Sequence, residues 1–99
     1  MLHIYEANAS PEALKEICAG LEEEGILYSI FSKTSADVKT LAFDAANHSK
    51  LRVGIGIAVS TAALQIRNCP IDKPVFLIDS DYRALGTNAG RAVKGGVFV

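Results

Sequence analysis

Apolar residues recur at helical spacing in three segments of the chain, and the first has clear end signals. Ser10 can cap a helix, and Pro11 would occupy its first position, where the missing N–H costs nothing. The apolar positions of this segment form one face, at Leu14, Ile17, Cys18 and Leu21. Gly25 is placed to end the helix in a left-handed conformation.

Two more helices follow from the same spacing. The second pattern begins at Ser35 and is broken by residues 47–49. Its apolar face comprises Val38, Leu41, Ala42 and Ala45. The third opens at Asp79-Ser80-Asp81, where carboxylates and a hydroxyl suit helix capping and the positive end of the helix dipole. Its inner face comprises Leu85, Ala89, Ala92 and Val93, and Gly95-Gly96 ends it.

Short apolar, β-branched or alternating runs between these helices predict five strands. They span residues 2–5, 26–31, 52–58, 63–67 and 75–78. The order β-α-β-α-β-β-α predicts an α/β fold in which a mixed, mostly parallel five-stranded sheet lies between helices in a three-layer α/β/α sandwich. The short link between the third and fourth strands favours an antiparallel hairpin. We expect residues 1–99 to form a single α/β domain.

Composition narrows the class of protein. The 99 residues are 49% hydrophobic and 21% charged, which is typical of a globular chain. The net charge of -1 argues against nucleic acid as a partner, and no apolar run approaches the roughly 20 residues of a membrane span. The first residues do not resemble a signal peptide, and two cysteines make no disulfide framework. We therefore expect a cytoplasmic protein with no membrane partner.

The residues do not match the phosphate- and dinucleotide-binding sites that are common in α/β folds. The loop after the first strand, residues 6–11, opens with the Glu6 carboxylate, which would repel phosphate. Gly54 and Gly56 make half a dinucleotide fingerprint, but Val59 replaces the third glycine and no helix follows. These glycines instead favour close packing of a helix on the strand.

Ordinary structural roles also account for the histidines and cysteines. His3 lies in a predicted strand, and the residues after His48 do not match a cobalamin-ligating loop. Cys18 lies on an apolar helix face, and Cys69 has no neighbouring histidine to activate it. We predict no catalytic and no cofactor-binding residue in this chain.

The end of the first helix breaks a local rule. Glu22, Glu23 and Glu24 face the negative end of the helix dipole, and Lys15 is too far back to pair with them. Helical geometry places Glu23 opposite the buried stripe. An outward carboxylate beside two others suits a hard cation such as Mg²⁺ or Ca²⁺, with a partner or water completing the shell. The alternative is a solvated acidic helix end.

Gly86 and Gly90 lie four residues apart in the third predicted helix, where each costs about 1 kcal/mol relative to alanine. Such a pair clears a groove in which another backbone can approach closely. The neighbour is either the protein's own sheet or a different subunit.

Four segments carry a resemblance to a known family. They are residues 20–26 (GLEEEGI), 49–56 (SKLRVGIG), 68–76 (NCPIDKPVF) and 83–95 (RALGTNAGRAVKG). In this order they resemble the small subunit of the reactivating factor of coenzyme B12-dependent diol and glycerol dehydratases. The longer medium subunit of the dehydratase itself is similar in the same segments.

The resemblance implies a mixed α/β/α sandwich and a non-catalytic role. The family's small subunit pairs with a large subunit that carries an actin-like ATPase domain and binds ATP or ADP, in an α2β2 heterotetramer. The complex acts as a chaperone that releases damaged cobalamin from the inactivated dehydratase by subunit exchange. The resemblance also implies that Glu23 contributes to a Mg²⁺ or Ca²⁺ site at the subunit interface. It places the protein in the cytoplasm, free or associated with a bacterial microcompartment.

Two alternatives remain open at this point. One is a structural subunit within a B12-dependent dehydratase. The other is a stand-alone α/β domain that binds a small molecule.

Overall fold

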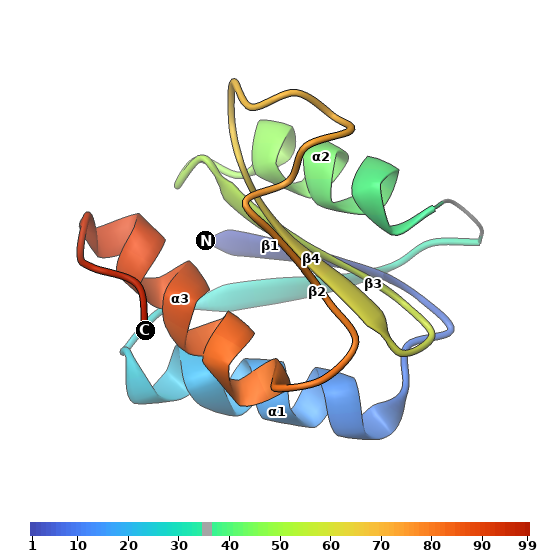
Figure 1. Ribbon diagram of the computed structural model, residues 1–99, viewed down its shortest axis with the longest axis horizontal. Helices are drawn as coiled ribbons and strands as arrows, with labels where there is room; N and C mark the ends of the chain where they lie inside the picture. The colour runs from blue at the N-terminus through green and yellow to red at the C-terminus, as the bar shows by residue number, and fades with distance from the viewer. Residues whose placement is uncertain (35–36) are drawn as a thin grey trace.

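The computed structural model describes residues 1–34 and 37–99, and their elements follow the predicted order (Figure 1). The strands are β1 (Leu2–Ala7), β2 (Tyr28–Ser32), β3 (Val53–Ala58), β4 (Thr61–Ile66) and β5 (Phe76–Ile78). The helices are α1 (Pro11–Glu23), α2 (Val38–His48) and α3 (Tyr82–Lys94). Within the described residues, no helix is long and apolar enough to span a membrane.

The sheet has the strand order β2-β1-β3-β4-β5. β1 pairs in parallel with both β2 and β3, whereas β4 is antiparallel to β3 and to β5. The mixed five-stranded sheet is therefore confirmed, and so is the antiparallel hairpin, which pairs Ala58 with Thr61 across its turn.

The helices form layers on both faces of the sheet (Figure 1). α1 and α3 lie side by side on one face, where Ile17, Leu21 and Leu85 join Leu2 and Ile4 in the larger apolar core. α2 covers the other face over β1, β3 and β4. The three-layer α/β/α sandwich and the apolar faces predicted for α1 and α3 are confirmed.

The helix ends test the capping predictions. Ser10 caps α1 by accepting a hydrogen bond from the Ala13 N–H, and Gly25 follows the helix with a φ of +72°, as expected. The expected start of the second helix at Ser35 lies outside the described residues; the described helix is capped by Asp37.

For α3 the capping prediction is wrong. Asp81 occupies the cap position, but its side chain makes no capping hydrogen bond, and its backbone is left-handed with a φ of +54°. The left-handed conformation of Asp81 therefore directs the chain from the β5–α3 loop into α3. Its side chain contributes only a negative charge near the positive end of the helix dipole.

Close backbone approach explains four of the glycines. A Cβ on Gly86 would lie 2.1 Å from the Ile17 carbonyl oxygen, and one on Gly20 would lie 2.5 Å from the Arg83 carbonyl oxygen. The neighbour of the α3 glycine groove is therefore α1. On the opposite face, a Cβ on Gly54 or Gly56 would meet the α2 backbone, at 2.1 Å from the Ala46 nitrogen in the first case. Close helix packing on the strand is confirmed.

Candidate functional site

The three consecutive carboxylates that follow the apolar stripe of α1 each have a different partner. The Tyr28 hydroxyl donates to Glu22 Oε2 at 2.6 Å. Lys94 Nζ lies 3.2 Å from Glu24 Oε1, and Arg91 Nε lies 4.0 Å from Glu24 Oε2. Arg83 Nη1 lies 3.3 Å from Glu23 Oε1. The repulsion expected from the sequence is thus offset by cations of α3 that are about 60 to 70 residues away along the chain.

The alignment of α1 with α3 supplies these partners. Glu16 pairs with Arg83 near the start of α3, and Glu24 pairs with Lys94 at its end, so the two helices run in the same direction. The tight contact at Gly90 brings α3 within 2.6 Å of the Glu24 Cβ, measured from an ideal Cβ on the glycine. The last turn of α3, which is basic, therefore lies against the last turn of α1, which is acidic.

Exposure separates Glu23 from Glu24. The Glu23 side chain is 59% exposed and the Glu24 side chain 19%. Glu23 thus points outward, in agreement with the direction expected from helical geometry. Its Oε1 faces Arg83, while Oε2 makes no hydrogen bond or ion pair with the other described residues. Glu23 is therefore better placed than Glu24 to reach a partner.

Arg83 links two carboxylates that lie two helical turns apart on α1. Its Nη2 lies 3.1 Å from Glu16 Oε1, and its Nη1 approaches Glu23. The hydrogen bond that Arg83 donates to the Glu16 carboxylate is the largest cause of the raised pKa of the Arg83 guanidinium. Arg83 reaches both because its backbone rests on Gly20, between the two carboxylates.

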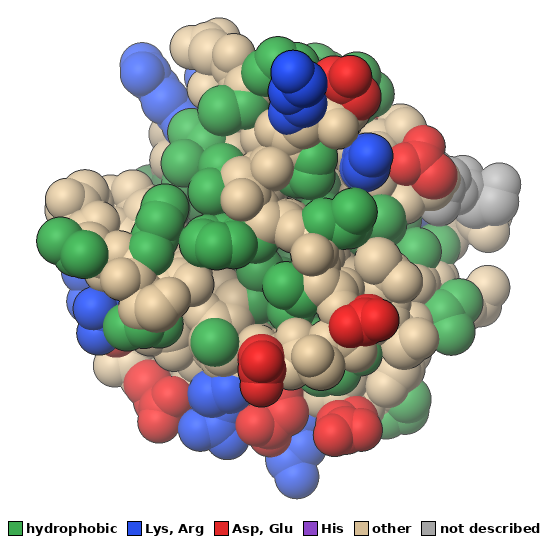
Figure 2. Space-filling model, viewed as in Figure 1, with side chains coloured by type: hydrophobic (Ala, Val, Ile, Leu, Met, Phe, Trp, Pro, Cys, Tyr) green, Lys and Arg blue, Asp and Glu red, His purple; other side chains and the backbone are tan. Residues whose placement is uncertain are grey.

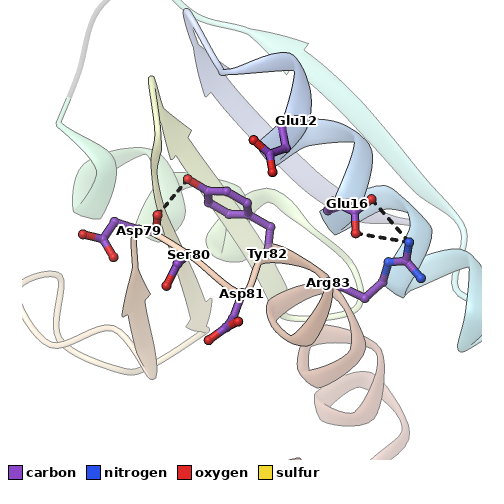
Figure 3. Close-up of a pocket in the computed structure, with 7 residues that line it drawn as sticks. All are labelled: Glu12, Glu16, Asp79, Ser80, Asp81, Tyr82 and Arg83. Carbon is purple, nitrogen blue, oxygen red and sulfur yellow. Dashed lines mark hydrogen bonds and ion pairs between the residues drawn. The ribbon is translucent and has the colours of Figure 1, made fainter.

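Beside Arg83, α1 and the β5–α3 loop border an open acidic hollow of about 410 Å³ (Figure 3). Its lining residues are Glu12, Glu16, Asp79, Ser80, Asp81, Tyr82 and Arg83. The Tyr82 hydroxyl points away toward the backbone and donates to the carbonyl oxygens of Ser60 and Asp79 at 2.6 and 2.9 Å. Four carboxylates and one guanidinium therefore make an open, negatively charged depression. The sequence places Asp79 and Asp81 at the start of the third helix, but it does not show that they lie near the carboxylates of α1.

Figure 2 shows the same arrangement at the surface, where acidic and basic side chains alternate along the rim that α1 and α3 form at the bottom of the view. Apolar side chains are more frequent above this rim. The rim is the polar part of this face.

The carboxyl ends of β1 and β3 are joined by hydrogen bonds. Folds of this kind bind phosphate at such positions through free backbone N–H groups. Here the Ser10 N–H donates to the Val59 carbonyl at 2.7 Å, and the Ala9 N–H donates to Glu6 Oε1 at 3.0 Å. Glu6 also accepts from the Ser32 hydroxyl, which is the largest cause of its lowered pKa. The N–H groups of Ala9 and Ser10 are therefore hydrogen-bonded within the protein and are not free to bind phosphate.

The histidines lie on the α2 side of the sheet. His48 Nδ1 is 3.1 Å from the Tyr5 hydroxyl, and the His3 ring packs against Phe31 with a centroid distance of 4.9 Å. Burial lowers the pKa of His3. Cys18 lies in the core between α1 and the sheet, and burial raises the pKa of its thiol. These contacts fit the structural roles expected for both residue types.

Glu23 could supply only part of the ligand set of a metal ion. In the part of the chain that the structure describes, no group of three or more Asp, Glu, His or Cys side chains is arranged to hold one. Glu23 offers an exposed carboxylate, a donor that Mg²⁺ and Ca²⁺ prefer, so other ligands would have to come from water or from another chain.

Comparison with known proteins defines the class. The sequence profile of the family described as dehydratase medium subunit matches residues 1–99. The chain belongs to this family.

Named relatives narrow the similarity to reactivating factors. The small subunit of the propanediol dehydratase-reactivating factor of Citrobacter freundii is 36% identical over 97 residues, which cover 93% of this chain and 84% of the relative. A solved glycerol dehydratase reactivase chain is 33% identical with a TM-score of 0.92, covering 99% of this chain and 95% of that one. A chain of a diol dehydratase-reactivating factor complexed with ADP and Mg²⁺ has the same coverage and TM-score at 30% identity.

Proposed function

We propose that this protein is the non-catalytic small subunit of a reactivating factor for a B12-dependent diol or glycerol dehydratase. The observation that carries the proposal is the 0.92 TM-score to a glycerol dehydratase reactivase chain over 99% of this chain at 33% identity. Curated relatives with the same subunit name add sequence support. The intramolecular use of the N–H groups in the β1–α1 loop is in keeping with an accessory role.

In this proposal the partner is a large subunit with an actin-like ATPase domain, and two copies of each subunit form the complex. ATP or ADP binds to the large subunit. The small subunit exchanges with the similar medium subunit of the inactivated dehydratase, so that damaged cobalamin is released. The match of the dehydratase medium subunit family to residues 1–99 supports exchange, because one fold would then fit two partners.

Glu23 is the residue proposed to contact the large subunit through a shared Mg²⁺ or Ca²⁺ ion. Its support is its place at the end of α1, its 59% exposure and its Oε2 atom, which makes no hydrogen bond or ion pair with the described residues. The ion would supply a directional bridge between carboxylates of two chains. Such a bridge gives specificity without a large apolar interface, which suits a contact that must form and dissociate.

A second candidate function is a structural role within the dehydratase itself. The name of the matching family favours it. Co-purification separates the two: an affinity-tagged copy of this chain is co-expressed either with the reactivase large subunit or with the large and small dehydratase subunits of the same organism. Stable recovery of an actin-like ATPase partner, and restored activity of cobalamin-inactivated dehydratase on addition of the complex and ATP, support the reactivase role. Retention of the dehydratase subunits alone would favour the structural role.

A further inference from the structure

Arg83 is the one cation in contact with Glu23 among the described residues, and the geometry points to a competition at that carboxylate. We infer that Arg83 is a built-in counter-ion that occupies Glu23 in the free subunit and limits how tightly a divalent cation binds there. The inference rests on the proposed role of Glu23 and adds a regulatory residue to it.

The position of Arg83 is fixed by the helix crossing. The backbone of Arg83 lies on Gly20, where a Cβ would come within 2.5 Å of the Arg83 carbonyl oxygen. This contact sets the guanidinium between Glu16 and Glu23, at 3.1 and 3.3 Å from their carboxylate oxygens. Because Glu16 holds one end of the guanidinium fork, the other end stays beside Glu23.

The positive charge of Arg83 opposes the binding of a cation to Glu23. A divalent ion on the free oxygen of Glu23 would lie about 5 Å from the guanidinium, judged from the ion pair and ordinary metal–oxygen distances. Coulomb repulsion at that distance in a water-like dielectric, reduced by salt, weakens the ion's binding by about threefold to tenfold. Arg83 would therefore reduce metal binding by the isolated subunit and weaken the metal-bridged interface by the same factor.

The neighbouring pairs on the same two helices provide matched controls. Arg91 is also on α3, but its partner is Glu24, at 4.0 Å. Glu12 lines the same acidic hollow as Glu16, and the structure gives it no ion pair with Arg83. Arg91→Gln thus removes an equal charge without freeing Glu23, and Glu12→Gln removes an acid without loosening Arg83.

The experiment measures the Mg²⁺ concentration at which the small subunit assembles half-maximally with its large subunit. Arg83→Gln is expected to lower this midpoint by about threefold to tenfold, with the difference shrinking at high salt, while Arg91→Gln leaves it unchanged. Glu16→Gln removes the anchor that holds Arg83 beside Glu23, so its midpoint is expected to lie below that of Glu12→Gln, which removes the same charge without loosening Arg83. An unchanged or raised midpoint for Arg83→Gln would overturn the inference.

A Glu23→Gln background separates this inference from the proposed function. If Glu23→Gln abolishes the metal dependence of assembly and Arg83→Gln has no effect in the wild-type background, the role of Glu23 stands and the counter-ion role of Arg83 fails. If Glu23→Gln leaves the metal dependence intact, the role of Glu23 itself fails. Mn²⁺-induced broadening of the backbone amide signals around residue 23 in the isolated chain provides a readout without the partner, and it should begin at lower Mn²⁺ in Arg83→Gln than in wild type or Arg91→Gln.

Discussion

The α-carbon of Gly86 on α3 faces the carbonyl oxygen of Ile17 on α1 so closely that a Cβ would lie 2.1 Å from that oxygen. No side chain fits between them, and the neighbour is rigid helical backbone. This contact sets the spacing of the two helices and, through it, the place of Arg83 beside Glu23.

Gly86→Ala is therefore expected to destabilise the protein. The added methyl group must push α1 and α3 apart, which outweighs the better helix propensity of alanine and costs about 2 kcal/mol in the free energy of unfolding. Urea unfolding measures the change. Gly96→Ala is the control, because a Cβ there would meet only ordinary contacts at 3.7 Å and beyond. A Gly86→Ala protein as stable as wild type would show that the helices are not held at this spacing.

Val59 in the β3–β4 turn is strained, and its replacement by glycine should stabilise the protein. Its φ of +57° is unfavourable for a β-branched residue, and its side chain is 60% exposed, so little packing is lost. Val59→Gly is expected to raise the free energy of unfolding by about 1 kcal/mol after the extra flexibility of the unfolded chain is allowed for. Thermal and urea unfolding measure this. Val59→Ala keeps the positive-φ penalty, so a larger gain from alanine than from glycine would contradict the explanation.

The lowered pKa of Glu6 predicts a loss of stability in acid. Hydrogen bonds from the Ser32 hydroxyl and the Ala9 N–H favour its ionised form in the folded state. Because the folded pKa lies below the ordinary value of 4.5, this contribution is present above pH 4.5 and is lost as the pH falls through the folded pKa.

Glu6→Gln tests this contribution, because glutamine retains an oxygen acceptor and does not titrate. Urea unfolding between about pH 7 and about pH 3 should show a smaller decline for Glu6→Gln than for wild type. Asp37→Asn is the companion variant: the pKa of Asp37 is also lowered, chiefly by the Thr40 hydroxyl, so it should remove a separate part of the decline. Parallel pH curves for wild type and Glu6→Gln would contradict the assignment.

Local patterns of the sequence predicted much of the fold. The apolar stripe that includes Ile17 and Leu21, the Ser10 cap and the left-handed Gly25 all depend on residues within a few positions of one another. The strand boundaries agree with expectation within about two residues because alternation and turn residues are also local signals. The outward direction of Glu23 followed from the helical repeat alone.

Local sequence patterns could not predict the contacts between segments that are far apart in the chain. The acidic end of α1 was expected to lack cations, because the sequence does not show that Arg83 and Lys94 would lie beside it. Gln65 alternates with apolar residues as a surface position would, yet it is fully buried and its amide donates to the Pro70 carbonyl at 3.0 Å. Asp81 was expected to cap α3, but its backbone is left-handed and its side chain makes no capping hydrogen bond.

Glu23 is proposed to join this subunit to a larger protein through a shared divalent cation. Calorimetric titration of the large subunit with the wild-type chain and with Glu23→Gln, each with Mg²⁺ and again with a chelator, tests this claim most directly. We expect Glu23→Gln and the chelator each to weaken binding by about tenfold or more, and the two effects together to be no larger than either alone. Equal affinity of wild type and Glu23→Gln in the presence of Mg²⁺ would contradict the claim.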